Sequence, residues 1–226
     1  MPKFDLDPKH FGFYLGINQM NFVIEPAIGL RNRMWQKNEI PDLTSDSARV
    51  LGVESVPVPG FSIGIVSCLR LNNYFDLRFL PGLLFGERQV IYSVEQYDNN
   101  KVFVTEMPKN ITSTFIDFPL YIKAKTKRVH NFRAFVTAGV AYKLDLASAA
   151  NDEEVNPTDI SVKLLRNDFT YDFGVGFDFY TVFFKFSTEF KMSYGLNDMI
   201  SREGNIYSDS FGRLSTKIFQ LNFTFE

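Results

Sequence analysis

The chain has 226 residues, enough for one β-barrel domain or two small domains, and it carries 25 phenylalanines and 10 tyrosines. Its net charge is −2, with 24 basic against 26 acidic residues, which excludes the basic excess of a nucleic-acid-binding surface. The mean hydropathy is −0.09, and no stretch approaches the roughly 20 continuous apolar residues of a membrane-spanning helix. Cys68 is the single cysteine, which excludes a disulfide-stabilised scaffold.

Eight segments along the chain have the period-two alternation of β-strands. Asn72-Asn73 predicts a tight hairpin, and Pro81-Gly82 predicts a bulge or bend within the third strand. The expected strands cover residues 10–24, 61–71, 74–94, 116–125, 132–140, 169–179, 184–193 and 219–225.

The clearest alternation lies in the sixth expected strand. Every odd position from Phe169 to Phe179 is aromatic or valine, while the even positions are small or acidic: Thr170, Asp172, Gly174, Gly176 and Asp178. A barrel wall in a bilayer requires such strands, with lipid outside and a polar lumen inside.

A soluble eight-stranded barrel would also alternate, so the size of the side chains must decide which face points inward. Six large side chains from one strand would overfill the lumen of an eight-stranded barrel, whereas the glycines leave room there. The sequence therefore predicts an all-β fold, an eight-stranded antiparallel up-and-down transmembrane β-barrel whose aromatic face contacts lipid.

The domain organisation expected from these strands is one outer-membrane β-barrel domain over residues 10–226. Residues 1–9 would form a periplasmic N-terminal extension, and long loops are expected at 25–60, 95–113, 147–167 and 196–211. An even strand number with a long first connection places both termini in the periplasm of a bacterial outer membrane. Met1 to Pro8 has no apolar segment, so export would use a signal peptide that is not present in this sequence.

The charged residues on the inward face are expected to pair, because an unpaired charge in a narrow lumen is costly. Lys185 or Lys191 can reach Asp172 or Asp178 across neighbouring strands. A polar conduit or proton path is the alternative function for the same residues. The expected structural network comprises Arg78, Asp117, Lys123, Arg133, Asp172, Asp178, Lys185, Glu189 and Lys191.

Residues suited to catalysis are few. A hydrolase needs a nucleophile with a positioned base, and His10 and His130 both fall on the rim expected to be periplasmic. Barrel enzymes work at the opposite rim, so we expect a protein without catalytic residues, cofactor or metal site. The acidic run 152–154 could attract calcium, but its spacing matches no calcium loop and a solvated loop is the simpler interpretation.

Two features outside the strands could contact a partner protein. Trp35, in the first long loop, either packs that loop onto the barrel rim or anchors a partner. Lys127 and Arg128, on a short basic turn, could bind anionic lipid heads or a periplasmic partner, or form a solvated turn.

Several motifs resemble those of one family of Bacteroidetes outer-membrane barrels, the PorT/SprT family. The resemblance covers nearly the full length. Its motifs are His10-Phe11-Gly12-Phe13-Tyr14-Leu15-Gly16, Leu77-Arg78-Phe79-Leu80-Pro81-Gly82, Ile116-Asp117-Phe118-Pro119-Leu120 and Ser193-Tyr194-Gly195-Leu196-Asn197.

This resemblance implies a role in the type IX secretion system, which exports folded proteins and builds the gliding machinery in gliding species. It implies no catalytic or ligand-binding residue. The expected partners are outer-membrane lipid and other type IX secretion components, with no nucleic acid. The expected function is a non-catalytic accessory or scaffold with a plugged polar lumen, and the alternative is a small-solute or lipid-binding outer-membrane barrel.

Overall fold

The computed structural model describes residues 7–36, 45–98, 101–150, 164–202 and 206–226. Short helices η2 (Leu30–Asn32), α1 (Leu146–Ala150) and α2 (Ile206–Asp209) lie between the strands. None of the helices in the described part of the chain is long and apolar enough to cross a membrane. The strands are β1 (Lys9–Pro26), β2 (Trp35–Gln36), β3 (Ser47–Arg70), β4 (Phe75–Phe79), β5 (Gly82–Asp98), β6 (Lys101–Lys125), β7 (Phe132–Asp145), β8 (Asn167–Tyr180), β9 (Lys185–Gly195) and β10 (Phe211–Phe225).

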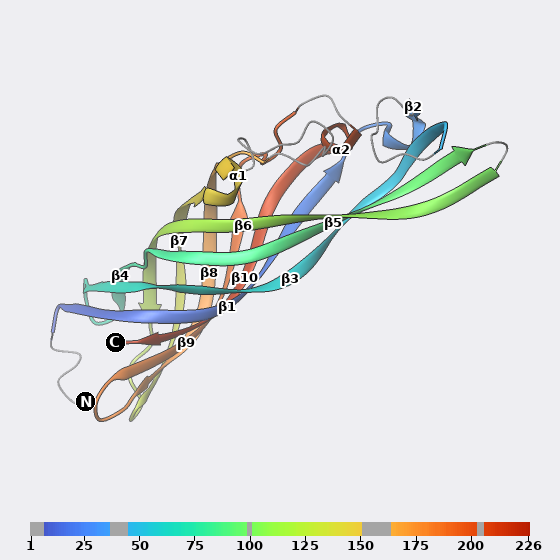
Figure 1. The fold of residues 1–226 in the computed structure, drawn as a ribbon. Helices are drawn as coiled ribbons and strands as arrows, with labels where there is room; N and C mark the ends of the chain where they lie inside the picture. The colour runs from blue at the N-terminus through green and yellow to red at the C-terminus, as the bar shows by residue number, and fades with distance from the viewer. Residues whose placement is uncertain (1–6, 37–44, 99–100, 151–163, 203–205) are drawn as a thin grey trace.

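Antiparallel pairing closes these strands into a barrel (Figure 1). Strands β6 to β10 each pair with the next, and β1 closes the ring by pairing with both β10 and β3. β3 pairs in turn with β4 and β5, which both pair with β6. Since β4 and β5 occupy one position in the wall, the ring has 8 strands, and the predicted fold is confirmed.

The interruption predicted at Pro81-Gly82 separates β4 from β5. Proline has no N–H to donate to a strand ladder, so a regular strand cannot continue through it unchanged. Neighbouring strands bridge the break: Leu80 N–H donates to Pro119 O at 3.4 Å, and Ile65 N–H donates to Pro81 O at 2.9 Å. The wall therefore stays closed at this point.

Two of the predicted loops are wrong over much of their length. β3 begins at Ser47, inside the expected loop 25–60, while β5 and β6 occupy residues 95–98 and 101–113 of the second expected loop. Both segments contain prolines, which sheets tolerate at bulges and edges. Pro57 lies where the register between β3 and β5 shifts, and Pro108 lies on an outer edge of β6.

The additional strand residues form a sheet that projects beyond the barrel, called the extension below. It consists of residues 47–57 of β3, 88–98 of β5 and 101–112 of β6. The extension leaves the barrel at the end opposite both chain termini (Figure 1). The short turns 71–74, 126–131 and 181–184 lie at the terminal end.

One face of the extension is buried by an apolar cluster. Leu30 of η2 and Trp35 of β2 pack there, and Tyr92 and Phe211 meet edge to face with ring centres 6.0 Å apart. Burying apolar surface is the main favourable term in such packing. The cluster thus fixes the extension on the barrel end. Its buried residues are Phe22, Leu30, Trp35, Ala48, Val50, Val53, Val90, Tyr92, Val94, Ile111, Ile200, Phe211 and Leu214.

The expected loops 147–167 and 196–211 lie at the same end and contact each other. Leu165 N–H donates to Met199 O at 2.7 Å, and Leu164 forms a β-bridge with Ile200. α1 lies at the start of the segment 147–167, and α2 lies near the end of the segment 196–211. The acidic run 152–154 lies outside the described residues.

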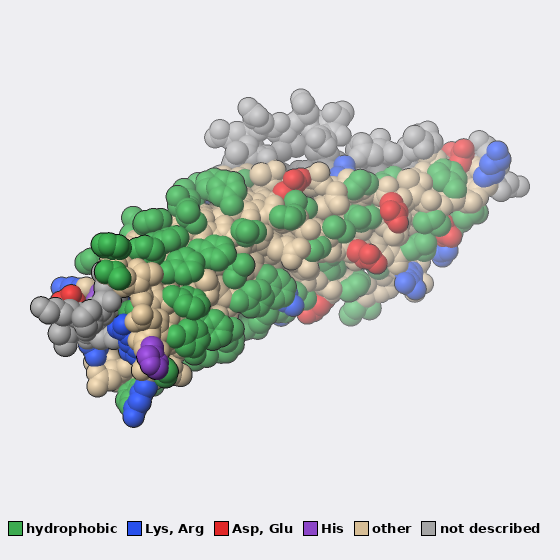
Figure 2. Space-filling model, turned by 90° about the horizontal axis from the view of Figure 1, so that it is seen from below, with side chains coloured by type: hydrophobic (Ala, Val, Ile, Leu, Met, Phe, Trp, Pro, Cys, Tyr) green, Lys and Arg blue, Asp and Glu red, His purple; other side chains and the backbone are tan. Residues whose placement is uncertain are grey.

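The outer wall of the barrel is apolar. In β8, the odd residues from Phe169 to Phe179 are 39–53% exposed, while every even residue is buried. Rings also stack between strands, as Phe186 does on Phe223 with centres 6.2 Å apart. Apolar side chains cover the barrel in Figure 2, whereas Lys, Arg, Asp and Glu gather on the extension and near the terminal end. This distribution matches a wall that contacts lipid.

Candidate functional site

The lumen of the barrel gathers most of the buried charge of the described residues. Its position follows from strand parity, because β8 buries its even residues and β9 buries its odd residues, and both sets point inward. All nine residues predicted for the lumen network are buried there.

Nearest the terminal end, Glu226 lies between two cations. Arg78 Nη2 lies 3.0 Å from Glu226 Oε1, and Lys185 Nζ lies 2.5 Å from Glu226 Oε2. Backbone hydrogen bonds in both directions, at 2.7 and 2.9 Å, also join Lys185 to Glu226. Arg78 Nη1 lies 3.7 Å from Glu189 Oε2, so the group links strands β4 and β9 to the residue that follows β10.

A second group of ion pairs lies beside the first. Lys123 Nζ donates to both oxygens of Asp178, at 2.7 and 2.8 Å, and Ser187 Oγ donates to the same carboxylate at 2.6 Å. Lys125 Nζ lies 2.5 Å from Asp76 Oδ1. Together these contacts connect β4, β6, β8 and β9. The contact between Lys123 and Asp178 joins β6 to β8, which are not neighbours in the wall.

The centre of the lumen is organised around Tyr121. Its hydroxyl donates to Asp172 Oδ2 and accepts from Lys191 Nζ at 2.9 Å. Lys191 Nζ lies 3.8 Å from Asp172, which also accepts from Thr170 Oγ1 at 2.7 Å. The phenol therefore connects an anion and a cation that are too far apart for a strong direct hydrogen bond.

Asp117 and Arg133 complete the predicted set. Asp117 accepts from Lys143 Nζ at 2.7 Å, with both side chains fully buried. The Arg133 guanidinium lies 5.5 Å from the Tyr180 ring centre, within the range of a cation–π contact.

The lumen wall made by β10, β1 and β3 is polar but uncharged. Buried atoms of Asn222, Gln220, Ser62 and Thr224 make no hydrogen bond with described protein groups. Buried polar groups of this kind are normally satisfied by ordered water. The lumen is thus two-sided, with ion pairs on β4 and β6–β9 and neutral hydrogen-bonding groups opposite.

Towards the extension, apolar layers replace the polar ones. Met20, Leu84, Phe115 and Ile218 are fully buried against one another. Above them, the Arg88 guanidinium lies 4.2 Å from the Phe22 ring centre and 3.4 Å from Asp145. The apolar cluster under the extension follows. Among the described residues, ion pairs, neutral polar groups and apolar side chains therefore line successive levels of the lumen.

All nine residues of the predicted network are buried, but the prediction omitted several of their partners. The predicted network omits Glu226, although its position directly after Phe225 gives it the inward parity of its strand. Lys143 continues the inward series of β7 beyond the predicted end of that strand, and Arg88 continues that of β5. Extending the alternation through these strands would have identified all three.

The structure places Trp35 and the basic turn differently. Trp35 is 3% exposed and lies within the apolar cluster, with the Arg33 guanidinium 3.8 Å from its ring centre. Of the two alternatives for Trp35, packing onto the barrel end is therefore the one observed, and the ring is not available to a partner. Lys127 is exposed, whereas Arg128 lies 3.9 Å from the Tyr180 ring centre and donates to His130 O at 2.7 Å.

The two histidines lie at the terminal end. His10 in β1 is paired with Cys68 of β3, and His130 occupies the turn before β7 with a positive φ of 55°.

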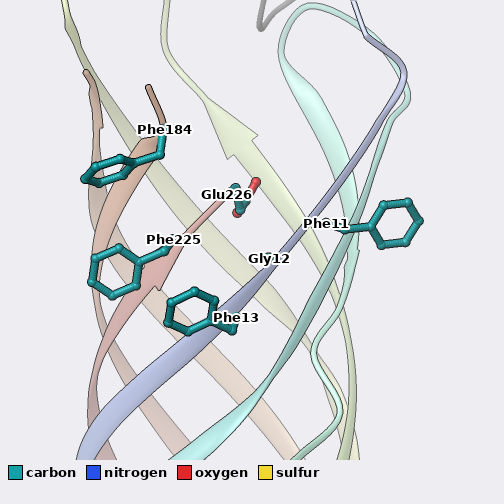
Figure 3. Close-up of a pocket in the computed structure, with 6 residues that line it drawn as sticks. All are labelled: Phe11, Gly12, Phe13, Phe184, Phe225 and Glu226. Carbon is teal, nitrogen blue, oxygen red and sulfur yellow. The ribbon is translucent and has the colours of Figure 1, made fainter. Parts of the chain in front are cut away.

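A groove of about 460 Å³ lies on the outer wall where β1 and β10 close the barrel (Figure 3). Gly12 forms its floor, and a Cβ there would meet Phe225 O at 2.0 Å. Phe13 and Phe225 stack with ring centres 5.1 Å apart, while Glu226 turns between the strands (Figure 3). The groove belongs to the apolar surface and offers little polar chemistry.

An apolar outer wall around a closed, charge-filled lumen defines a transmembrane β-barrel. The chain belongs to the family described as "Outer membrane protein beta-barrel domain", whose profile matches residues 8–201. It is therefore a bacterial outer-membrane β-barrel, and contact with membrane lipid follows from that class.

Solved structures similar to the chain are also outer-membrane proteins. The outer membrane protein OprG from Pseudomonas aeruginosa shares 12% identity with a TM-score of 0.45, covering 95% of this chain and 93% of that one. The outer membrane protease OmpT from Escherichia coli shares 13% identity with a TM-score of 0.40, covering 97% and 95%. A search of curated proteins finds no significant match.

Proposed function

We propose that this outer-membrane barrel is a non-catalytic accessory or scaffold protein of type IX secretion, with a lumen that its own side chains close. The observation that carries the proposal is the mutual pairing of the lumen charges. Lys123 with Asp178 and Lys143 with Asp117 face each other at 2.7 Å. Charges that neutralise one another in a low-dielectric interior serve cohesion more than transport.

The non-catalytic part of the proposal is supported by the placement of the histidines. Both lie on the terminal rim, in a strand start and a turn, away from the buried carboxylates at the centre of the lumen. General acid–base chemistry requires a base within hydrogen-bond reach of the reacting group. We infer that the terminal rim is periplasmic and that the extension lies outside the cell, since short turns typically face the periplasm.

The secretion pathway is supported by the sequence resemblance to the PorT/SprT family. The motif at residues 77–82 includes Arg78, which lies at the centre of the ion-pair group with Glu226 and Glu189. Residues that give the family its resemblance therefore also build the closed lumen. Other type IX components are the expected protein partners, and they would bind outside the lumen.

A small-solute or lipid-binding barrel is the second candidate. The apolar groove of Phe11, Phe13, Phe184 and Phe225 is the observation that favours it, because a lipid chain could lie there (Figure 3). Loss of lipid binding after Phe184→Ala, with export of type IX cargo unchanged, would support this candidate over the first.

Deletion of the gene tests the pathway assignment. We expect loss of type IX cargo from the culture medium, restored by the wild-type gene and by a variant in which Lys123 and Asp178 are exchanged. The exchanged variant preserves the ion pair and so separates lumen cohesion from any transport role of the individual charges. Unchanged export after deletion would contradict the proposal.

A further inference from the structure

We propose that the outer edge of β6 in the extension binds an extended segment of a partner protein, which adds to the sheet as a further strand. β5 pairs with β6 from Asp98↔Lys101 to Gly82↔Asp117, whereas the pairing with β7 begins only at Phe115. Among the described residues, no strand pairs with the second edge of β6 between Lys101 and Thr114.

The register identifies which backbone groups point away from β5. Lys125 N–H donates to Tyr74 O at 2.8 Å, and Pro119 O accepts from Leu80 N–H, so odd residues of β6 face β4 and β5. Thr114 N–H points the other way and donates to Asp145 Oδ1 at 3.3 Å. Because the register of β5 with β6 runs without a shift, even residues from Val102 to Thr112 turn their backbone groups outward.

The outward groups form a short edge suited to strand addition. Val102, Val104 and Glu106 can each donate an N–H, while Pro108 has none. Val102 and Val104 are also 57% and 58% exposed. Apolar side chains of an added strand could pack against them as cross-strand pairs. Pro108 limits the open edge on one side, a common way to restrict unwanted pairing.

The second edge of β3 in the extension is covered only in part by described residues. β2 pairs with β3 at Trp35↔Ala48 and Gln36↔Ser47, and Arg31 Nε donates to Leu51 O at 2.9 Å. On β6, Asp145 already accepts from Thr114 N–H, at the point where β7 ends and α1 begins. The open edge thus begins where these contacts stop and extends away from the membrane-spanning wall.

The occupant that fits is an extended chain from a different protein. Donors and acceptors alternate along the edge at strand spacing, and a β-strand matches that pattern. A second copy fits less well. Two copies in one membrane share its normal as their symmetry axis, so β6 strands that rise from it could pair only in parallel, the weaker arrangement. The inference is independent of the secretion pathway.

The test uses the full-length barrel in lipid nanodiscs and a fluorescein-labelled ten-residue peptide of alternating threonine and valine. Val104→Pro removes one outward N–H and leaves the ladder with β5 intact, as Pro108 does in the native strand. Val104→Thr is the matched control. We expect saturable binding to the wild type and to Val104→Thr, weakened about tenfold in Val104→Pro by loss of one hydrogen bond and obstruction of its neighbours.

Pro108→Val tests the same edge in the opposite direction. It restores a donor to the outward row, so peptide binding should become several-fold tighter than for the wild type. Unchanged heat-modifiable mobility on gels would verify that each variant is folded. Equal binding to Val104→Pro and Val104→Thr would overturn the proposal. So would the absence of saturable binding to the wild type, or a barrel dimer that competes with the peptide.

Discussion

The barrel and the extension are built partly from the same strands, β3, β5 and β6, but these strands have different surroundings in the two regions. Within the barrel, each strand has neighbours on both sides, lipid on one face and the lumen on the other. In the extension, one face packs on the apolar cluster, the other faces solvent, and one edge of β6 is open. The same three strands therefore form part of a closed wall in the barrel and a sheet with an open edge in the extension.

The largest expected effect comes from breaking a lumen ion pair. Asp178→Asn keeps the shape of the side chain but leaves Lys123 buried without its counter-charge. The free energy of unfolding should fall by about 3–5 kcal/mol, the usual cost of removing one member of a buried pair. Urea unfolding of the barrel in lipid vesicles, followed by circular dichroism, measures this change.

The double variant Asp178→Asn with Lys123→Met is the control. It removes both charges, so it should recover at least half of the stability that the single variant loses. A double variant no more stable than Asp178→Asn would contradict this account, because the loss could then not come from the uncompensated charge of Lys123.

Arginine substitution at equally exposed valine and phenylalanine positions compares the two regions directly. Phe173 in the middle of β8 is 52% exposed, and Val102 in the extension is 57% exposed. Phe173→Arg should cost about 2–4 kcal/mol, because a charge at the bilayer midplane is poorly solvated. Val102→Arg should stay within about 0.5 kcal/mol. Similar losses for both, in the same unfolding assay, would contradict the assignment of the lipid face.

The smallest expected effect is a pH dependence of the extension. Hydrogen bonds from Tyr97 and then Arg49 hold the pKa of Glu95 below the ordinary value of 4.5. A carboxylate with a lowered folded pKa stabilises the fold above its unfolded pKa, and the contribution disappears as the pH falls through the folded value. Residues 88–98 should therefore lose hydrogen-exchange protection on acidification.

Glu95→Gln provides the reference for this measurement. Its extension has no carboxylate to titrate, so protection corrected for intrinsic exchange should be independent of pH in that range. The same pH profile in the wild type and in Glu95→Gln would refute the contribution of Glu95.

The sequence was sufficient for the barrel, because lipid and lumen impose alternation on every residue of the wall. The series from Phe169 to Phe179 shows both the strand and its orientation, and Asp172 and Asp178 are inward in the structure as expected. Pairing partners were harder to predict. Asp178 on β8 pairs with Lys123 on β6, two strands away, since such contacts depend on strand order and tilt as well as on parity. Lys185 pairs with Glu226, its register neighbour just beyond the predicted end of the last strand.

The extension could not be predicted in the same way. Without a lipid face, residues 101–107 carry valine and phenylalanine on both faces, and Pro57, Pro59 and Pro108 resemble loop signals. The sheet tolerates these prolines because its register shifts after Pro57 and because the backbone nitrogen of Pro108 points away from β5. Both features are defined only by the strand pairing. The buried position of Trp35 likewise depends on the apolar cluster under the extension.

The central claim is that the lumen side chains hold this barrel closed. Single-channel recording of the purified barrel in a planar bilayer tests it most directly, with an open porin as the positive control. The account predicts no stable open current for the wild type, because ion-pair layers and the Met20, Leu84, Phe115 and Ile218 layer fill the lumen. Stable, long-lived currents through the wild-type protein would contradict it.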